Sequence, residues 1–284
     1  MSINLLERIE ASDVARSEQR LTSERAPFAE RDAFISRSEL KFSISEDTAV
    51  QIRKTALLSM KLDPHCSAAH GNYEVHTVYL DSTDMAIYRK SLKREVDRFK
   101  LRIRFYDDDP ASPVFLEVKK SASGLGTKMR VAVERETANT LFASNDHLTV
   151  VKATNSEFWE LANRFNARPI IHIGYVREAF VGRDDPNTRL TLDRMIRCEA
   201  APSELTTAMR DPIHIWPDKV ILEIKYAGGM PCYIRDLIRQ FHLETIKASK
   251  YMQSVGSGLT THADLPAPIG RAEHARISAN DHRG

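Results

Sequence analysis

The stretch FKLRIRFY, from Phe99 to Tyr106, decides how the fold is interpreted, because its side chains alternate strictly between two types. Lys100, Arg102 and Arg104 occupy one phase, whereas leucine, isoleucine and phenylalanine occupy the other. Alternation with a period of two predicts a β-strand with one apolar and one charged face. What the charged face points at therefore determines what the protein can bind.

Charged residues recur with the same period in several further segments, each with apolar residues in the opposite phase. These in-phase residues are Glu39 and Lys41; Glu117 and Lys119; Lys128 and Arg130; Arg189, Thr191 and Asp193; and Glu223 and Lys225. One interpretation is a sheet with an apolar core face and a solvated charged face. The other is a sheet that closes with its charged faces inward and its apolar faces under helices.

The composition is that of a globular protein, with 42% hydrophobic and 28% charged residues over 284 positions. No apolar run approaches the roughly 20 residues of a membrane helix, and the first residues lack the apolar core of a secretory signal. The three cysteines form no CxxC pair, which favours a reducing cytoplasm. The net charge is only +2, yet the segment from Arg89 to Arg135 is basic, which favours a defined anion site.

The order of the predicted elements indicates an α+β fold, because helices fall between runs of strands rather than after every strand. We expect about eight antiparallel strands that close into a β-barrel flanked by helices. Residues 1–32 are expected to form an N-terminal extension, residues 33–256 the domain, and residues 257–284 a disordered tail without apolar periodicity.

The positive charges in a lumen lined with lysine and arginine must be compensated, because burying an unpaired cation costs on the order of several kcal/mol. Water, carboxylates or a bound polyanion could provide it. A chain of phosphates suits such a lumen, since it is slim and rich in acceptor oxygens. Arginine offers a planar fork to phosphate oxygens, and lysine offers a mobile point charge.

The sequence resembles the VTC domain, the polyphosphate polymerase branch of the CYTH-like triphosphate tunnel metalloenzymes. The resemblance spans roughly residues 33 to 253 and depends on motifs in a fixed order: ELKF, KLRIRFY, FLEVKK, TKMR, YVREAF, RLTLD, ILEIKY and KASKY. It implies an eight-stranded antiparallel barrel whose basic interior holds a triphosphate or polyphosphate, with Mn²⁺ or Mg²⁺ bound by acids. The hydrolase branch carries ExExK in its first strand, whereas this chain has Arg37 in place of the first glutamate. This departure favours the VTC-like branch over an adenylate cyclase or a thiamine triphosphatase.

The resemblance also assigns roles to residues. It implies catalytic and phosphate-binding roles for Lys41, Arg102, Arg104, Lys119, Arg177 and Lys250. Further phosphate contacts are expected from Lys128, Arg130, Arg189, Lys247 and Ser249. The expected metal ligands are Glu223, Asp193 and Glu117.

The expected reaction is transfer of the ATP γ-phosphate to the end of a polyphosphate chain. A metal-dependent triphosphatase or polyphosphatase, and a non-catalytic polyphosphate-binding module, remain as alternatives. Nucleic-acid binding is disfavoured, because Phe99 and Phe105 lie in the phase opposite to the basic residues. VTC-type domains elsewhere work with membrane-embedded partners, and here another protein would have to supply such a partner. Oligomeric state stays open.

Overall fold

The structure is a computed structural model that describes residues 37–66, 70–122, 125–143 and 157–258. The expected N-terminal extension over residues 1–32 lies outside the described residues, as does almost all of the expected tail over residues 257–284.

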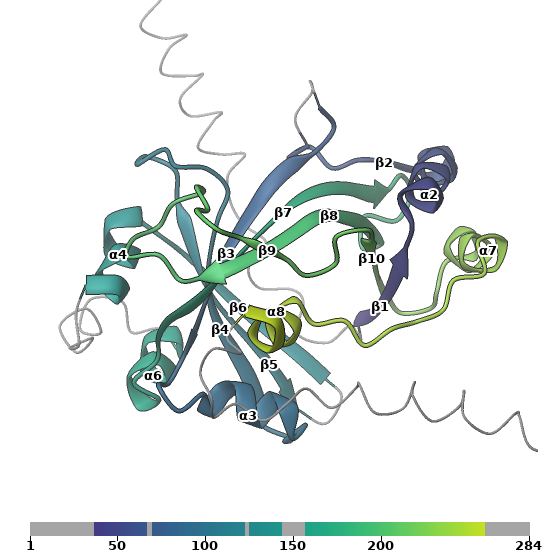
Figure 1. The fold of residues 1–284 in the computed structure, drawn as a ribbon. Coiled ribbons are helices and arrows are strands. Elements are labelled where there is room, and N and C mark those ends of the chain that lie inside the picture. The colour runs from purple at the N-terminus through teal and green to yellow at the C-terminus, as the bar shows by residue number, and fades with distance from the viewer. Residues whose placement is uncertain (1–36, 67–69, 123–124, 144–156, 259–284) are drawn as a thin grey trace, which may run out of the picture. The chain divides into compact units, whose positions relative to one another are not determined.

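The described residues form one antiparallel sheet of ten strands (Figure 1). The strands are β1 (Arg37–Ile44), β2 (Met60–Leu62), β3 (Tyr73–Asp81), β4 (Arg98–Phe105), β5 (Val114–Ala122), β6 (Leu125–Val133), β7 (Arg168–Gly182), β8 (Arg189–Ala200), β9 (Ile213–His214) and β10 (Val220–Ala227). The path through the sheet is β1-β10-β8-β7-β3-β4-β5-β6, with β2 paired to β7 and β9 paired to β8. The strands predicted from the alternation, and the α+β class, are confirmed.

The expected closed barrel is wrong, because the sheet curls into an open half-barrel. Closure requires the first and last strands to meet in register, and within the described residues no backbone pairing joins β1 to β6. The two strands therefore remain as the edges of the sheet. Side chains bridge the opening instead, since Lys119 on β5 donates a hydrogen bond of 3.2 Å to Glu39 on β1.

Six helices accompany the sheet in the described part of the chain. They are α2 (Glu46–Ser59), α3 (Ala86–Leu92), α4 (Arg135–Ala143), α6 (Glu157–Arg164), α7 (Cys232–Gln240) and α8 (Lys250–Gly258). The sequence predicts α2, α3, α6 and α7 from the segments SEDTAVQIRKTALLSMK, STDMAIYRKSLK, SEFWELANRF and PCYIRDLIRQFHL, whereas α4 and α8 are additional. None of the described helices is both long and apolar enough to cross a membrane.

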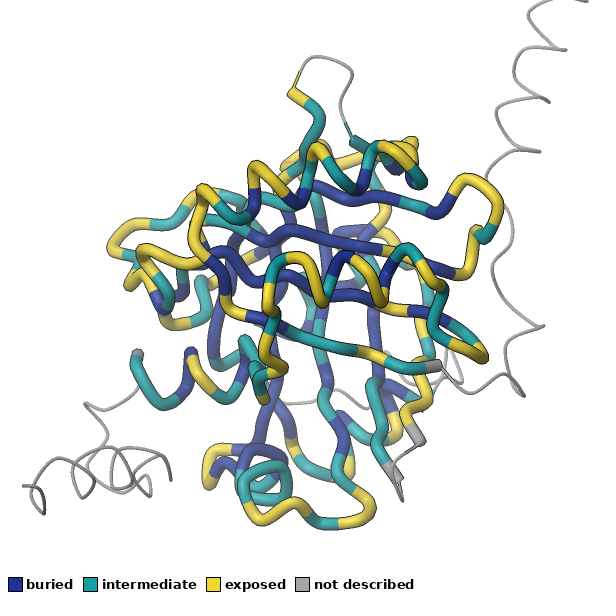
Figure 2. The backbone as a smooth tube through the Cα atoms, turned by 90° about the vertical axis from the view of Figure 1, so that its right-hand side faces the viewer, coloured by how far each residue is buried: buried dark blue, intermediate teal, exposed yellow. Residues whose placement is uncertain are grey.

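The apolar phase of the strands forms the core together with the outer helices. Leu101 and Ile103 of β4 pack with Phe158 and Trp159 of α6 in one fully buried cluster. A second cluster joins the apolar phase of β10 and β8 to α2 and α7. Figure 2 shows buried strands behind helices whose outer sides are exposed. Because the helices take the apolar phase on the outer face, the charged phase faces the inside of the curve.

The inner face is not charged along its whole length. Tyr251 and Val255 of α8 pack against Ile173 and Tyr175 of β7 and Ile196 of β8, in a third buried cluster. In Figure 1, α8 accordingly lies within the curve of the sheet. The inner face therefore has an apolar part occupied by α8 and a charged part beside it.

Candidate functional site

Most of the predicted site residues gather on the charged part of the inner face. Strands β1, β4, β5, β6, β7, β8 and β10 contribute alternate side chains, and the segment that leads into α8 contributes the rest. Those linked by hydrogen bonds or ion pairs are Lys41, Arg102, Arg104, Lys119, Lys128, Arg130, Arg177, Ser249, Lys250, Glu117, Asp193 and Glu223.

The β4–β6 half of this face is organised around one buried carboxylate, that of Glu117. Its side chain is completely buried, and Arg102 Nε donates to Oε2 at 2.5 Å. Lys128 Nζ and Arg130 Nε lie 2.7 Å and 3.4 Å from Oε1. Burial would raise the pKa of Glu117, but Arg102, Arg104 and Lys128 hold that pKa well below its usual value. One carboxylate thus orients several cations.

Arg104 is a buried cation of this half whose hydrogen-bond partners among the described residues include no carboxylate. Its Nη2 donates to Thr77 Oγ1 and to the Tyr175 hydroxyl, each at 3.3 Å. Among the described residues, no hydrogen-bond partner reaches the buried Nε. A buried guanidinium with an unused donor is a suitable partner for an anionic ligand, because an unmade buried hydrogen bond is costly.

The other half of this face comprises Arg177 of β7, Asp193 of β8, Glu223 of β10 and Lys250 of α8, and is called the β8–β10 half. Acids and bases alternate in it. Arg177 donates from Nε and Nη2 to the two Asp193 oxygens, each at 2.7 Å. Lys250 Nζ donates to Asp193 Oδ2 at 2.6 Å and to Glu223 Oε1 at 3.1 Å. Burial would raise both carboxyl pKa values, but neighbouring cations keep them low: chiefly Arg177 and Lys250 for Asp193, and chiefly Lys250 and Lys225 for Glu223.

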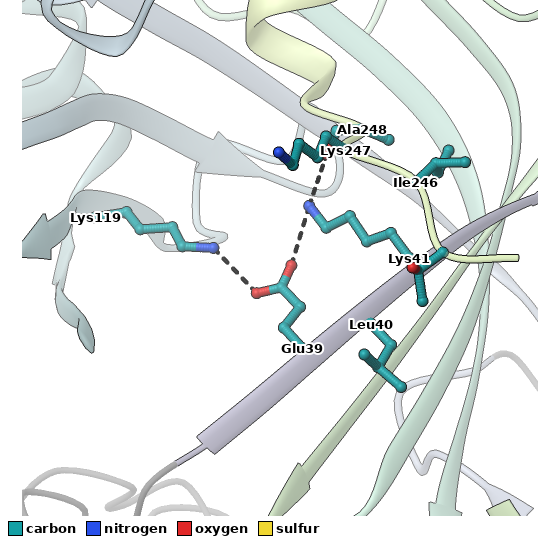
Figure 3. A pocket seen from close by; sticks show the side chains of 8 residues that line it. Glu39, Leu40, Lys41, Lys119, Ile246, Lys247 and Ala248 are labelled. Atoms are coloured by element: carbon teal, nitrogen blue, oxygen red, sulfur yellow. Dashed lines mark hydrogen bonds and ion pairs between the residues drawn. The ribbon is translucent and has the colours of Figure 1, made fainter. Parts of the chain in front are cut away.

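Lys41 extends this alternation to the edge of the sheet. Its Nζ lies 3.7 Å from Glu223, 3.0 Å from Glu39 Oε1 and 3.0 Å from the Ala248 carbonyl oxygen. Figure 3 shows the Glu39 carboxylate between Lys41 and Lys119. Although burial acts in the opposite direction, Lys225, Lys41 and Lys119 lower the pKa of Glu39 to about 2. A cavity of about 450 Å³ opens here, lined by β1, Lys119 and residues 245–248.

The acids of the β8–β10 half fit part of a divalent cation site. In the described ranges, no three acidic, histidine or cysteine side chains converge closely enough to hold a metal by themselves. Asp193 and Glu223 instead share one ammonium group, so their oxygens already surround a cation. Mg²⁺ commonly takes one or two carboxylates and completes its shell with water and substrate phosphates. Glu117, the third predicted ligand, is not brought together with them.

Two lysines on the inner face have lowered pKa values. Lys100 Nζ donates to Ser249 Oγ at 2.8 Å, and burial lowers its pKa to about 8. Burial also lowers the pKa of Lys128 to about 7, although Glu117 acts in the opposite direction. A bound anion would stabilise the charged forms of both ammonium groups.

Of the remaining predicted phosphate contacts, one lies away from these clusters and one lines the cavity. Arg189 lies at the start of β8 and pairs with Asp63, whose carboxylate is buried. Lys247 lines the cavity beside Lys41.

The sequence analysis missed two tyrosines on the same face. The Tyr175 ring lies 4.8 Å from Lys250 Nζ and 5.2 Å from the Arg177 guanidinium. Tyr79 accepts a 3.3 Å hydrogen bond from Arg102 Nη1. Tyr175 shares the phase of Arg177, so the alternation carried the signal that could have found it.

Solved structures from several organisms match this chain at low sequence identity. HpAC1 from Hippeastrum, assigned as an adenylyl cyclase and described as having a dominant triphosphatase activity, is 16% identical with a TM-score of 0.45, covering 76% of this chain and 94% of its own. PH1819 from Pyrococcus horikoshii is 14% identical with a TM-score of 0.43, covering 77% and 97%. A Bacillus halodurans protein assigned as an adenylate cyclase is 11% identical with a TM-score of 0.42, covering 75% and 95%. At these levels the likeness carries no conclusion about activity.

Sequence comparison is more informative about the family. No curated protein matches the chain. The family model of the VTC domain, however, matches residues 36–258, which include every strand and helix described above. The chain therefore belongs to the VTC domain family.

Proposed function

We propose that the chain is a phosphotransferase of the polyphosphate polymerase type, which moves the ATP γ-phosphate onto a polyphosphate chain held on the inner face. The observation that supports this most strongly is the excess of cations there. The basic side chains are Lys41, Lys100, Arg102, Arg104, Lys119, Lys128, Arg130, Arg177, Lys225 and Lys250, and the carboxylates are Glu39, Glu117, Asp193 and Glu223. A linear polyanion that runs along the sheet would compensate the excess.

The chemistry suits a site made mainly of cations. Phosphoryl transfer proceeds through a loose transition state, so positioning and charge stabilisation provide most of the catalysis. Arg102 and Arg104 would hold phosphate oxygens from the β4–β6 half, while Arg177 and Lys250 would hold them from the opposite half. Donors on two walls would keep the attacking and leaving oxygens in line.

The divalent cation, Mn²⁺ or Mg²⁺, belongs in the β8–β10 half under this proposal. Glu223 and Asp193 would hold it, and Lys250 would then exchange its carboxylate contacts for phosphate oxygens. The cation would supply charge stabilisation to the phosphoryl oxygens. Glu117 would keep its role as the anchor of Arg102, Lys128 and Arg130.

A hydrolase is the second candidate, and the open sheet favours it. In the described part of the chain no backbone pairing joins β1 to β6, so no backbone hydrogen bonds close the sheet on that side against water. Water in place of the polyphosphate end would make the same site a triphosphatase or polyphosphatase.

A binding module without turnover is the third candidate. It is favoured by the ion pairs that Lys250 and Arg177 make with Asp193 and Glu223, which satisfy these acids without a metal.

Incubation of the purified protein with ATP and Mn²⁺ distinguishes the three candidates. Long-chain polyphosphate on a gel supports the polymerase, whereas orthophosphate alone supports the hydrolase. Binding of tripolyphosphate without either product supports the binding module. Absence of binding and turnover contradicts the proposed use of the inner face, provided that thermal unfolding shows a folded protein.

A further inference from the structure

Asp81 is a buried carboxylate outside the charged clusters, at the end of β3. It is completely buried, and Oδ1 accepts hydrogen bonds from the backbone N–H groups of Ser82 at 2.7 Å and Ile87 at 2.9 Å. Oδ2 accepts from the N–H of Tyr88 at 2.7 Å and from the Tyr251 hydroxyl at 2.6 Å. One carboxylate therefore joins β3, α3 and α8.

Tyr251 is held by its ring as well as by its hydroxyl. The ring stacks on Tyr79 with a centroid distance of 4.7 Å and meets Tyr88 edge-on at 6.0 Å. Its exposed fraction is 1%. The first turn of α8 is consequently fixed against both β3 and α3.

The residues just before Tyr251 contact the charged clusters. Lys250 donates to Asp193 and Glu223, and Ser249 accepts from Lys100. These contacts come from three different strands, while residues 243–249 form neither helix nor strand. The position of the Lys250 ammonium therefore depends on how the first turn of α8 is held.

We propose that Asp81 is a positioning residue, which acts through the Tyr251 hydroxyl to hold Lys250 and Ser249 against the phosphate chain. This inference rests on the proposed function. The carboxylate does not touch the inner cluster itself, since its hydrogen bonds to the backbone and to Tyr251 occupy both oxygens.

The test compares two tyrosine-to-phenylalanine variants by calorimetric titration with inorganic tripolyphosphate. Tyr251→Phe removes the hydroxyl that Asp81 holds and keeps the ring. Tyr88→Phe is the matched control, because its ring packs against the same Tyr251 and its hydroxyl has no hydrogen-bond partner among the described residues. A lost hydrogen bond to a buried charge predicts about tenfold weaker binding for Tyr251→Phe, and unchanged binding for Tyr88→Phe.

A double-mutant cycle with Lys250→Met separates positioning from simple stabilisation. If Asp81 acts through Lys250, Tyr251→Phe loses most of its effect on binding once Lys250 is absent. Additive effects would overturn the inference. Asp81→Asn tests the same hydrogen bond from the carboxylate side. We expect it to weaken tripolyphosphate binding at least as much as Tyr251→Phe.

The outcomes also separate this inference from the proposed function. Wild-type protein that does not bind tripolyphosphate contradicts the proposed function. Wild-type protein that binds, together with equal affinities for Tyr251→Phe and Tyr88→Phe, contradicts the role of Asp81 alone.

Discussion

The two halves of the inner face use the same kinds of side chain in different proportions. In the β4–β6 half, Glu117 is shared by Arg102, Lys128 and Arg130, and Arg104 remains without a carboxylate. In the β8–β10 half, acids and bases alternate and nearly balance. The first arrangement attracts anions, whereas the second can exchange an ammonium for a metal ion. The ratio of acids to bases, rather than their identity, distinguishes the two roles.

The largest expected effect concerns the balanced half. Glu223→Gln removes a proposed ligand of the divalent cation, so we expect turnover of ATP to fall by about 100-fold or more, since such a cation contributes several kcal/mol of charge stabilisation. Steady-state phosphate or polyphosphate release at saturating Mn²⁺ measures it. Glu160→Gln on the exposed side of α6 is the control. Equal turnover in the two variants would remove Glu223 from the reaction.

Glu117→Gln in the other half should act on stability instead. The substitution removes the negative charge that Arg102 pairs with, and leaves the Arg102 guanidinium buried without a carboxylate partner. Breaking a buried ion pair in this way costs about 3 kcal/mol. Urea unfolding measures the change in the free energy of unfolding. Tripolyphosphate should restore part of the loss, because a ligand that binds only the folded state stabilises it. A variant as stable as the wild type would show that Glu117 does not organise this half.

The pH dependence of binding should also differ between the halves. Lys128 has a pKa lowered to about 7, so the free protein loses this charge as the pH rises, and binding of tripolyphosphate then requires proton uptake. We expect the contribution of Lys128 to fall by up to about tenfold per pH unit above its pKa. Titrations between pH 6 and 9 measure it, with Lys128→Arg as the control, because arginine keeps its charge. Identical pH profiles for both proteins would contradict the assignment.

The smallest expected effect concerns the contact between the two edges. Lys119 is 43% exposed, and its pair with Glu39 has the character of a surface ion pair. Lys119→Met should therefore change the free energy of unfolding by less than about 1 kcal/mol. Thermal unfolding at low and high salt measures this. A much larger loss of stability would mean that the pair holds the half-barrel together.

The period-two alternation predicted the strands and which side chains share a face, because this periodicity is a local property of the chain. The phase of Lys41 and Arg104 in their strands is thus enough to assign both residues to the charged face. Closure could not be predicted in this way, since it depends on whether two strands distant in sequence meet. The alternation placed the acids on the inner face as well, but their separation into two groups depends on the order of strands in the sheet.

Helix α8 is a second feature that depends on contacts between residues distant in sequence. Its sequence, KYMQSVGSG, contains two glycines, which disfavour a helix, and the sequence pattern did not predict one there. It is held by tertiary contacts, among them the hydrogen bond from Tyr251 to Asp81, 170 residues away. A contact of this kind leaves no periodic trace in either segment.

Among the described residues β1 and β6 are unpaired edges of the sheet, and this has a consequence for how a long polymer is loaded. A closed barrel admits a linear polymer only by its end. An open half-barrel can admit the polymer at any point along its open side. With the proposed substrate, the interior of a long polyphosphate could enter sideways once the Lys119–Glu39 contact across the opening separates, without any search for a terminus. Capture would then scale with contour length, and chains whose ends are blocked would still be captured.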